Sequence, residues 1–149
     1  PSLGLLTLNA LVAADEVLVP IQCEYYALEG VTQLMRTIEA VRHAMNKELR
    51  LGSILMTMFD GRTRLSTQVD EEVRTHFARE TMSTRIPRSV RVSEAPSYSR
   101  SVLTYEPTSA GAVAYREAAA EFAKRHACDE HSTNTSGVKH PDASDTKKG

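Results

Sequence analysis

The segment Val17-Leu18-Val19-Pro20-Ile21 is a compact apolar run, mostly of β-branched residues, and it decides the fold. Runs of this kind are typical of strands buried in a parallel sheet, and the proline indicates a place near a sheet margin. A strand over 16–22 would deliver residues 22–24 to its carboxyl end. Apolar side chains at helical spacing follow over 27–46, so the sequence predicts a strand followed directly by a helix.

The same alternation of strand and helix continues along the chain. The other expected elements are an opening helix over 3–14 capped by Ser2, a strand over 51–59, a helix over 66–80, a strand over 84–86 and an alanine-rich helix over 109–127. The segment 93–103 is rich in turn residues and has no assigned element. This order indicates an α/β fold with a parallel sheet and covering helices.

The composition indicates one globular unit. Of the 149 residues, 41% are hydrophobic and 25% are charged, which is close to globular averages. No apolar run approaches the ~20 residues of a membrane span. A net charge of −1 argues against a protein that coats nucleic acid through bulk charge. We expect a domain over 1–127 and a disordered polar tail over 128–149, because the tail has hardly any apolar side chain.

The two cysteines indicate a reduced, intracellular protein. Cys23 lies in an apolar setting and Cys128 in a polar one, so we expect no disulfide framework and a cytoplasmic location. His126, Cys128 and His131 are close in sequence but lack a fourth ligand, so no metal site is expected. The carboxylates at 70–72 are interpreted as the solvated face of a helix.

Ligands of open α/β sheets bind at the carboxyl ends of the strands. Three segments at such positions, 22–30, 57–64 and 87–97, are polar or basic. The last belongs to the stretch 86–97, interpreted as a loop in which arginine alternates with small polar residues, as in loops that contact an anion. No GxxxxGK[ST] phosphate loop occurs, so this chain alone is not expected to hold a triphosphate in the usual way.

Four stretches together resemble a known family. They are Pro1-Ser2-Leu3-Gly4-Leu5-Leu6-Thr7-Leu8-Asn9-Ala10-Leu11, Val19-Pro20-Ile21-Gln22-Cys23-Glu24-Tyr25-Tyr26-Ala27-Leu28-Glu29-Gly30, Met56-Thr57-Met58-Phe59-Asp60 and Ile86 to Ser97. Over roughly 1–124 the chain is similar to the carboxyl half of the ParA (Soj) chromosome-partitioning ATPases. The resemblance implies a partial P-loop NTPase fold of the deviant Walker A, SIMIBI type, with its N-terminal phosphate-loop half missing. Because the sequence has no initiator methionine, Pro1 is interpreted as a truncation point.

The resemblance also implies a function. Members of the family use ATP and Mg²⁺, dimerise around ATP, bind DNA nonspecifically as the dimer, and release it when a ParB-like partner stimulates hydrolysis. A cytoplasmic, nucleoid-associated location without membrane attachment follows. The catalytic residues of the family would all precede Pro1. None is therefore assigned within this chain, and the chain alone is expected to be inactive.

Site residues are carried over from the matched motifs. The adenine pocket of the family, built largely from backbone groups, matches Thr57, Met58, Pro87 and Arg88. These positions lie on two neighbouring strand exits. The resemblance therefore predicts that the two exits together form a wall against the nucleotide base.

The arginines that the family uses on DNA match Arg62 and Arg91. Arginine binds phosphate without reading sequence, so these contacts would be nonspecific and sensitive to salt. Gln22 and Glu24 match a loop near the nucleotide and the dimer face. Weaker candidates for the DNA surface are Arg64, Arg85, Arg88 and Arg100.

Three alternatives stay open. A MinD-like ATPase that switches membrane attachment would need a terminal amphipathic helix, which 128–149 does not show. An iron–sulfur reductase of the nitrogenase iron-protein type would need cluster-ligating cysteines, and Cys23 has no suitable neighbours. A free-standing, non-catalytic DNA-binding or dimerisation module is the third alternative. The sequence upstream of Pro1 would distinguish this module from a partial ATPase.

Overall fold

The computed structural model describes residues 4–133, with side chains as far as Ala127. Predictions for Ser2 and for 134–149 lie outside the described residues. In chain order, the elements are α1 (Leu5–Ala13), β1 (Glu16–Gln22), α2 (Ala27–Ala44), β2 (Arg50–Phe59), α3 (Arg64–His76), β3 (Thr81–Pro87), α4 (Val90–Glu94), the short 3₁₀ helix η1 (Ala95–Tyr98), α5 (Val102–Tyr105) and α6 (Ala110–Thr133).

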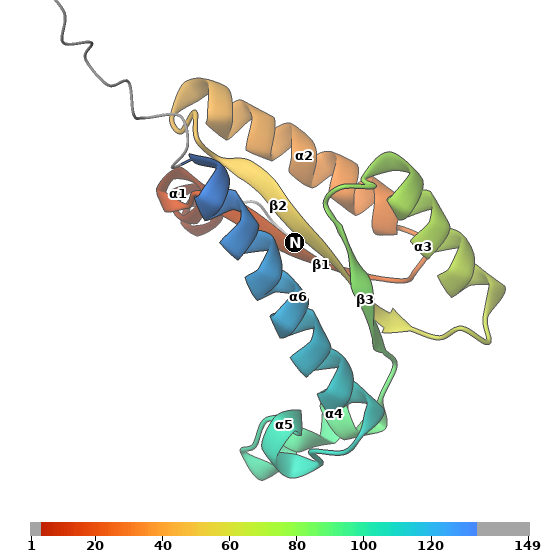
Figure 1. Ribbon diagram of the computed structural model, residues 1–149. Helices are drawn as coiled ribbons and strands as arrows, with labels where there is room; N and C mark the ends of the chain where they lie inside the picture. The colour runs from red at the N-terminus through yellow and green to blue at the C-terminus, as the bar shows by residue number, and fades with distance from the viewer. Residues whose placement is uncertain (1–3, 134–149) are drawn as a thin grey trace, which may run out of the picture.

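Three parallel strands form a sheet in the order β1, β2, β3. Helices α2 and α3 lie on one side of the sheet and α6 runs along the other side (Figure 1). Strand β1, which contains Pro20, is an outer strand of the described sheet, as predicted. The predicted α/β fold, a parallel sheet with covering helices, is confirmed.

Strand β2 contributes to the cores on both sides of the sheet, because successive side chains of a strand point to opposite faces. Ile54 and Met56 are fully buried in the core beneath α2 and α3. Leu55 lies between them in sequence and packs with Met82 and Ile86 in the core beneath α6. Burial on both faces explains why the strand reads as a continuous apolar run.

A bulge distorts β2 near its carboxyl end. Met56 is paired with Arg85 and Phe59 with Pro87, so β2 has one more residue than β3 between these two pairs. Within the bulge, Met58 has a left-handed backbone with φ 54°. Side chains other than glycine rarely adopt this conformation, and residues held in it cluster at binding sites.

Two charged side chains of α6 cover the outer edge of β3. Glu121 accepts hydrogen bonds from the backbone N–H groups of Ser83 (2.7 Å) and Thr84 (2.9 Å) and from the Thr84 hydroxyl. Arg125 donates to the carbonyl oxygens of residues 79–81 and to Glu121. Several of the backbone groups that an exposed edge strand would offer to another strand are thus occupied, namely the N–H groups of Ser83 and Thr84 and the carbonyl of Thr81.

A second set of charges joins α6 to the amino ends of the strands. His126 is hydrogen-bonded through Nε2 to Glu16 of β1, and Glu16 also pairs with Arg50 at 3.1 Å. The Nδ1 atom of His126 is hydrogen-bonded to the carbonyl oxygen of Phe122. The Phe122 carbonyl and then the Glu16 carboxylate stabilise the protonated imidazole, so the pKa of His126 is raised above its usual value.

The boundary between α3 and β3 corrects the prediction. The sequence predicts a helix to Glu80 and a strand from Thr84, whereas α3 ends at His76 and β3 begins at Thr81. Phe77 leaves helical geometry, and its carbonyl accepts hydrogen bonds from the N–H (2.9 Å) and hydroxyl (2.7 Å) of Thr81. Because of this tight turn, the strand begins at Thr81, earlier than the β-branched residues of the sequence alone indicate.

The ends of α1 and α6 also differ from the predictions. Gly4, in an extended conformation, is the N-cap of α1, where the sequence predicts capping by Ser2. Helix α6 continues to Thr133, past the predicted end at Ala127, so the expected boundary of the tail at Cys128 falls inside a helix. Adding residues to an existing helix is far easier than starting one, and this allows a polar segment to extend it.

The stretch 86–97 is not the loop that the sequence predicts. After β3 the chain forms α4, η1 and α5, which pack against the start of α6 (Figure 1). The close approach of α4 requires Gly111, because a Cβ there would lie 2.6 Å from Val92. Arg91 is therefore held on a packed helix. The small core of this lobe consists of Ala95, Val102 and Ala112.

Candidate functional site

Backbone and hydroxyl hydrogen bonds join the three strand exits at the carboxyl edge of the sheet. The Cys23 N–H donates to the Thr57 carbonyl, and the Thr57 hydroxyl donates to the Ile21 carbonyl, both at 3.0 Å. The Arg88 N–H donates to the Phe59 carbonyl at 2.9 Å. The structure thus brings together the segments that the sequence predicts as a site. It also commits the Thr57 carbonyl and the Arg88 N–H to bonds within the protein.

A hollow of about 960 Å³ opens beside these exits, between the start of α2 and the turn before α3. Gln22, Glu24 and Arg88 line it, and Glu24 pairs with Arg88 at 3.7 Å. Both charged side chains are more than half exposed, so the pair itself contributes little to stability. Three predicted base-contacting residues are not among those that line the hollow, namely Thr57, Met58 and Pro87.

Cys23 borders the same hollow but is nearly inaccessible, with 4% of its surface exposed. Burial raises the pKa of its thiol to about 11, with a smaller contribution from the charge of Asp70. The thiol therefore stays protonated and unreactive near neutral pH. Among residues 4–127, no group of His, Cys, Asp or Glu side chains is arranged to hold a metal ion.

Arg62 lies in the turn after β2 and is bound to Asp60 at two points. Its Nε donates to Oδ1 and an Nη donates to Oδ2, both at 2.9 Å. These hydrogen bonds lower the pKa of Asp60 to about 2. The Arg62 side chain is 89% exposed, and its remaining guanidinium donors can bind a second anion. The sequence alone does not indicate that this arginine has an acidic partner.

Arg91 has a similar arrangement on α4. Its guanidinium pairs with Glu94 at 3.0 Å, one turn along the same helix, and 54% of the side chain is exposed. Both predicted DNA-binding arginines are therefore accessible, and each is paired with one carboxylate. They lie in the segments that follow the carboxyl ends of β2 and β3, so the parallel topology puts them at the same end of the sheet.

Asp70 corrects the interpretation of residues 70–72 as a solvated face. Glu71 and Glu72 are exposed, but Asp70 is only 3% exposed. Its Oδ2 accepts hydrogen bonds from Arg74 (3.0 Å) and from Arg85 (2.6 Å), a weaker candidate for the DNA surface. Burial alone would raise the pKa of Asp70, but the two arginines outweigh burial and lower it.

The chain is similar in sequence to a known protein family and to several curated proteins. The AAA_31 family, described as an AAA domain, matches residues 1–51. The chain is 50% identical over 123 residues to the sporulation initiation inhibitor protein Soj of Bacillus subtilis. It is 54% identical over 125 residues to the chromosome-partitioning ATPase Soj of Thermus thermophilus. The resemblance to ParA/Soj proteins is confirmed.

The match to ParA/Soj proteins covers 83% of this chain and 49% of the Bacillus protein, and 84% of this chain and 50% of the Thermus protein. The chain thus spans about half the length of the curated relatives it matches. The ParA of Caulobacter vibrioides, 52% identical, is covered to a similar extent, 47%.

Solved structures support the partial P-loop NTPase fold. A cobyrinic acid a,c-diamide synthase from Mycobacterium smegmatis, with a bound ATP analogue and magnesium, matches with a TM-score of 0.62 and 40% identity. The match covers 78% of this chain and 42% of the synthase. A structure of the synthase with ADP and magnesium matches with a TM-score of 0.60.

Proposed function

We propose that this chain is part of an ATPase of DNA segregation, which dimerises with ATP, binds DNA nonspecifically as the dimer, and hydrolyses ATP when a ParB-like partner stimulates it. The observation that carries the proposal is the identity of 52–54% to chromosome-partitioning proteins over more than four-fifths of this chain. A nucleoid-associated location in the cytoplasm follows from this proposal.

The part of the nucleotide site that fits this chain is the wall against the base. The bulge at Met58, held between the exits of β1 and β3, offers strained and fixed backbone of the kind found at ligand sites. We assign the base to Thr57, Met58, Pro87 and Arg88, and assign no catalytic or magnesium-binding residue within this chain.

The DNA contact is assigned to Arg62 and Arg91. Both are exposed at the carboxyl edge, and arginine on phosphate supplies sequence-independent affinity. Gln22 and Glu24 line the hollow, and we assign them to the region next to the nucleotide or the dimer face. This arrangement sets the DNA-binding arginines close in sequence to the base wall, so nucleotide state and DNA binding are linked through the same strand exits.

The test is the double variant Arg62→Ala, Arg91→Ala in the full-length protein. We expect weaker retention on DNA and a shallower dependence of affinity on salt, by roughly one unit of log–log slope for each phosphate that is no longer neutralised. ATP binding should be unchanged, as measured with a fluorescent ATP analogue.

The matched control is Arg42→Ala, Arg79→Ala. Arg42 also pairs with a glutamate one turn away, Glu39, but it lies near the end of α2, and Arg79 precedes β3, so both are at the opposite edge of the sheet. This control should bind DNA normally. Equal DNA affinity in the Arg62, Arg91 variant and the unchanged protein would contradict the assignment.

A second candidate function follows from the solved structures, because the named relative there is a cobyrinic acid a,c-diamide synthase. Identity to that enzyme is 40%, against 50–54% to the Soj and ParA proteins, so DNA segregation is favoured. A protein that forms the diamide and does not bind DNA would support the alternative. Among residues 4–133, no helix is long and apolar enough to cross a bilayer.

A further inference from the structure

A charge network around the buried carboxylate of Asp70 connects α3 to β3. Asp70 of α3 binds both Arg74 and Arg85 through a single carboxylate oxygen. Arg74 also donates to the backbone carbonyl of Met82, at 3.0 Å. We call Asp70, Arg74 and Arg85 the brace. Because its members come from a helix and from the neighbouring strand, the brace holds α3 against β3 at two points.

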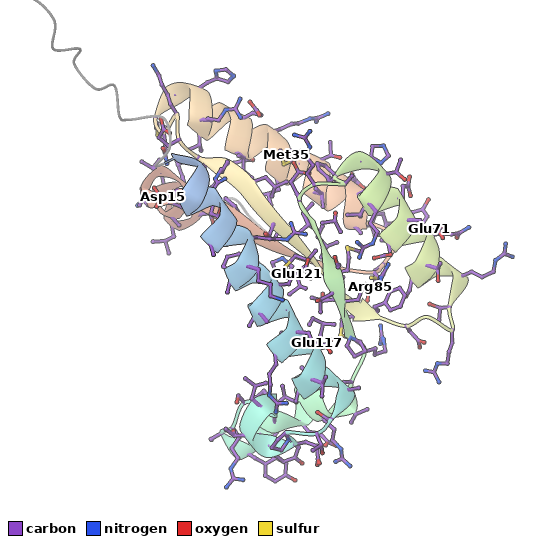
Figure 2. The ribbon with its side chains drawn as sticks, viewed as in Figure 1. Asp15, Met35, Glu71, Arg85, Glu117 and Glu121 are labelled. Carbon is purple, nitrogen blue, oxygen red and sulfur yellow. The ribbon has the colours of Figure 1, made fainter. Side chains whose placement is uncertain are left out.

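The brace reaches the bulge through Phe59. The Arg85 guanidinium lies over the Phe59 ring, 5.4 Å from its centroid. Phe59 immediately follows Met58, the residue with the left-handed backbone, and its carbonyl accepts the Arg88 N–H. One arginine side chain therefore contacts both the buried carboxylate and the residue that ends the bulge. Figure 2 shows Arg85 on β3.

Stability alone does not account for this network. Removing charges from water commonly cancels what their attraction gains, and apolar side chains in such places are often as stable. The second carboxylate oxygen of Asp70, Oδ1, is buried without a hydrogen-bond partner, which has a further cost. What such a network supplies is a defined geometry, and the geometry at this place is that of the bulge.

We propose that Asp70 and Arg85 are positioning residues for the nucleotide base, which they serve by fixing Phe59 and the left-handed Met58 in the wall at the carboxyl edge. The inference rests on the proposed function, since it assumes that the base binds at this wall. Neither residue touches the nucleotide. Their loss should loosen the wall and leave the sheet intact.

The test compares two variants of the full-length protein. In each, one carboxylate that is hydrogen-bonded to β3 is replaced by the neutral amide. Asp70→Asn weakens the brace, whereas the control Glu121→Gln weakens the cover of the strand's outer edge, away from Phe59. For Asp70→Asn we expect the Kd for ATP to rise by roughly threefold to tenfold. Mutations of residues that do not contact a ligand commonly change its affinity by such factors. The preference for ATP over GTP should fall as well, which general destabilisation would not cause.

Amide hydrogen exchange supplies a readout that does not depend on nucleotide. Asp70→Asn should speed exchange of the Arg88 amide, bonded to Phe59, and leave the amides of Ser83 and Thr84 unchanged. Glu121→Gln should show the reverse. Unchanged Arg88 exchange in Asp70→Asn would overturn the inference. A different result would be faster Arg88 exchange in Asp70→Asn together with an unmodified protein that does not bind ATP. This result would reject the proposed function, and with it the role toward the base, but it would support the structural role of the brace.

Discussion

The outer edge of β3 and the carboxyl edge of the sheet both use paired charges, but in opposite ways. At the outer edge, Glu121 and Arg125 are only 19% and 28% exposed and satisfy backbone groups of the strand. At the carboxyl edge, Arg62 and Arg91 are 89% and 54% exposed and each pairs with one carboxylate. Charges that bond backbone groups of a strand stabilise the fold, whereas exposed pairs contribute little and stay available to a ligand.

The comparison also separates two kinds of pH response. Burial alone would raise the pKa of Glu121, but hydrogen bonds from two backbone N–H groups, the Thr84 hydroxyl and Arg125 lower it to about 2. The pKa of His126, which anchors the other end of α6 to Glu16, is raised. Stability should therefore respond to acid through Glu121 and near neutral pH through His126.

The largest expected effect tests the outer edge. Glu121→Ala leaves two backbone donors and Arg125 without their carboxylate, so we expect a loss of about 2–3 kcal/mol in the free energy of unfolding. Urea denaturation followed by circular dichroism measures this loss. DNA binding under conditions where the protein is folded should not change. Glu117→Ala is the control, since Glu117 is exposed on the same helix (Figure 2).

The effect of Glu121 should also depend on pH in a defined direction. A carboxylate with a lowered pKa stabilises the folded state above its unfolded pKa of 4.5 and loses this contribution as the pH falls toward about 2. The difference between the unchanged protein and Glu121→Ala should thus shrink in that window. If Glu121→Ala and Glu117→Ala lowered the free energy of unfolding equally at neutral pH, the stabilising role assigned to Glu121 at the outer edge would be contradicted.

A smaller effect is expected from the carboxylates at the carboxyl edge. Asp60→Asn with Glu94→Gln frees Arg62 and Arg91 from their partners. Removing two negative charges beside these arginines should strengthen DNA binding by roughly twofold to tenfold at low salt, and less at high salt. The measurement is DNA affinity across a salt series. Glu39→Gln, which frees Arg42 at the opposite edge, should have no effect, and weaker binding by the double variant would contradict this interpretation.

The smallest effect concerns His126. Because its folded pKa is raised, its bond to Glu16 stabilises the protein fully below the ordinary pKa of 6.5, and this contribution is lost as the pH rises through the folded value. Burial and the charge of Arg50, which also pairs with Glu16, oppose the rise in pKa. Unfolding measured between pH 6 and 8, near that pKa, should show this decline in the unchanged protein and in His43→Gln. His126→Gln should flatten it, and a decline of equal size in His126→Gln would exclude this bond as the cause.

Regular apolar patterns in the sequence predicted most of the fold. Strand β1 has the predicted bounds, and α2 and β2 differ from prediction by one or two residues at their ends. These elements are long or fully buried, so their hydrophobic periods are unambiguous. The α3–β3 boundary was predicted wrongly, because the turn between Phe77 and Thr81 depends on local hydrogen bonds that composition does not reveal.

The candidate site was predicted in outline only. The sequence and the family resemblance named the strand exits, and the structure joins these exits by hydrogen bonds. The acidic partners of Arg62 and Arg91 lie two and three residues away, at spacings also common between unpaired residues. The role of Glu121 and Arg125 follows an i, i+4 pattern that is typical of any solvated helix. Spacing alone could not single out these pairs.

The sequence by itself determined most of the strands and the long helices, that the sheet is parallel, and which exits carry arginine, because these depend on periodicity and on order along the chain. Only the tertiary structure decided that Asp70 is a buried anchor and not a solvated charge. It also decided that Met58 is held in a left-handed bulge and that Arg91 lies on a packed helix. The reason is physical: burial, register and charge pairing between elements depend on residues far apart in the chain, and no local pattern contains them.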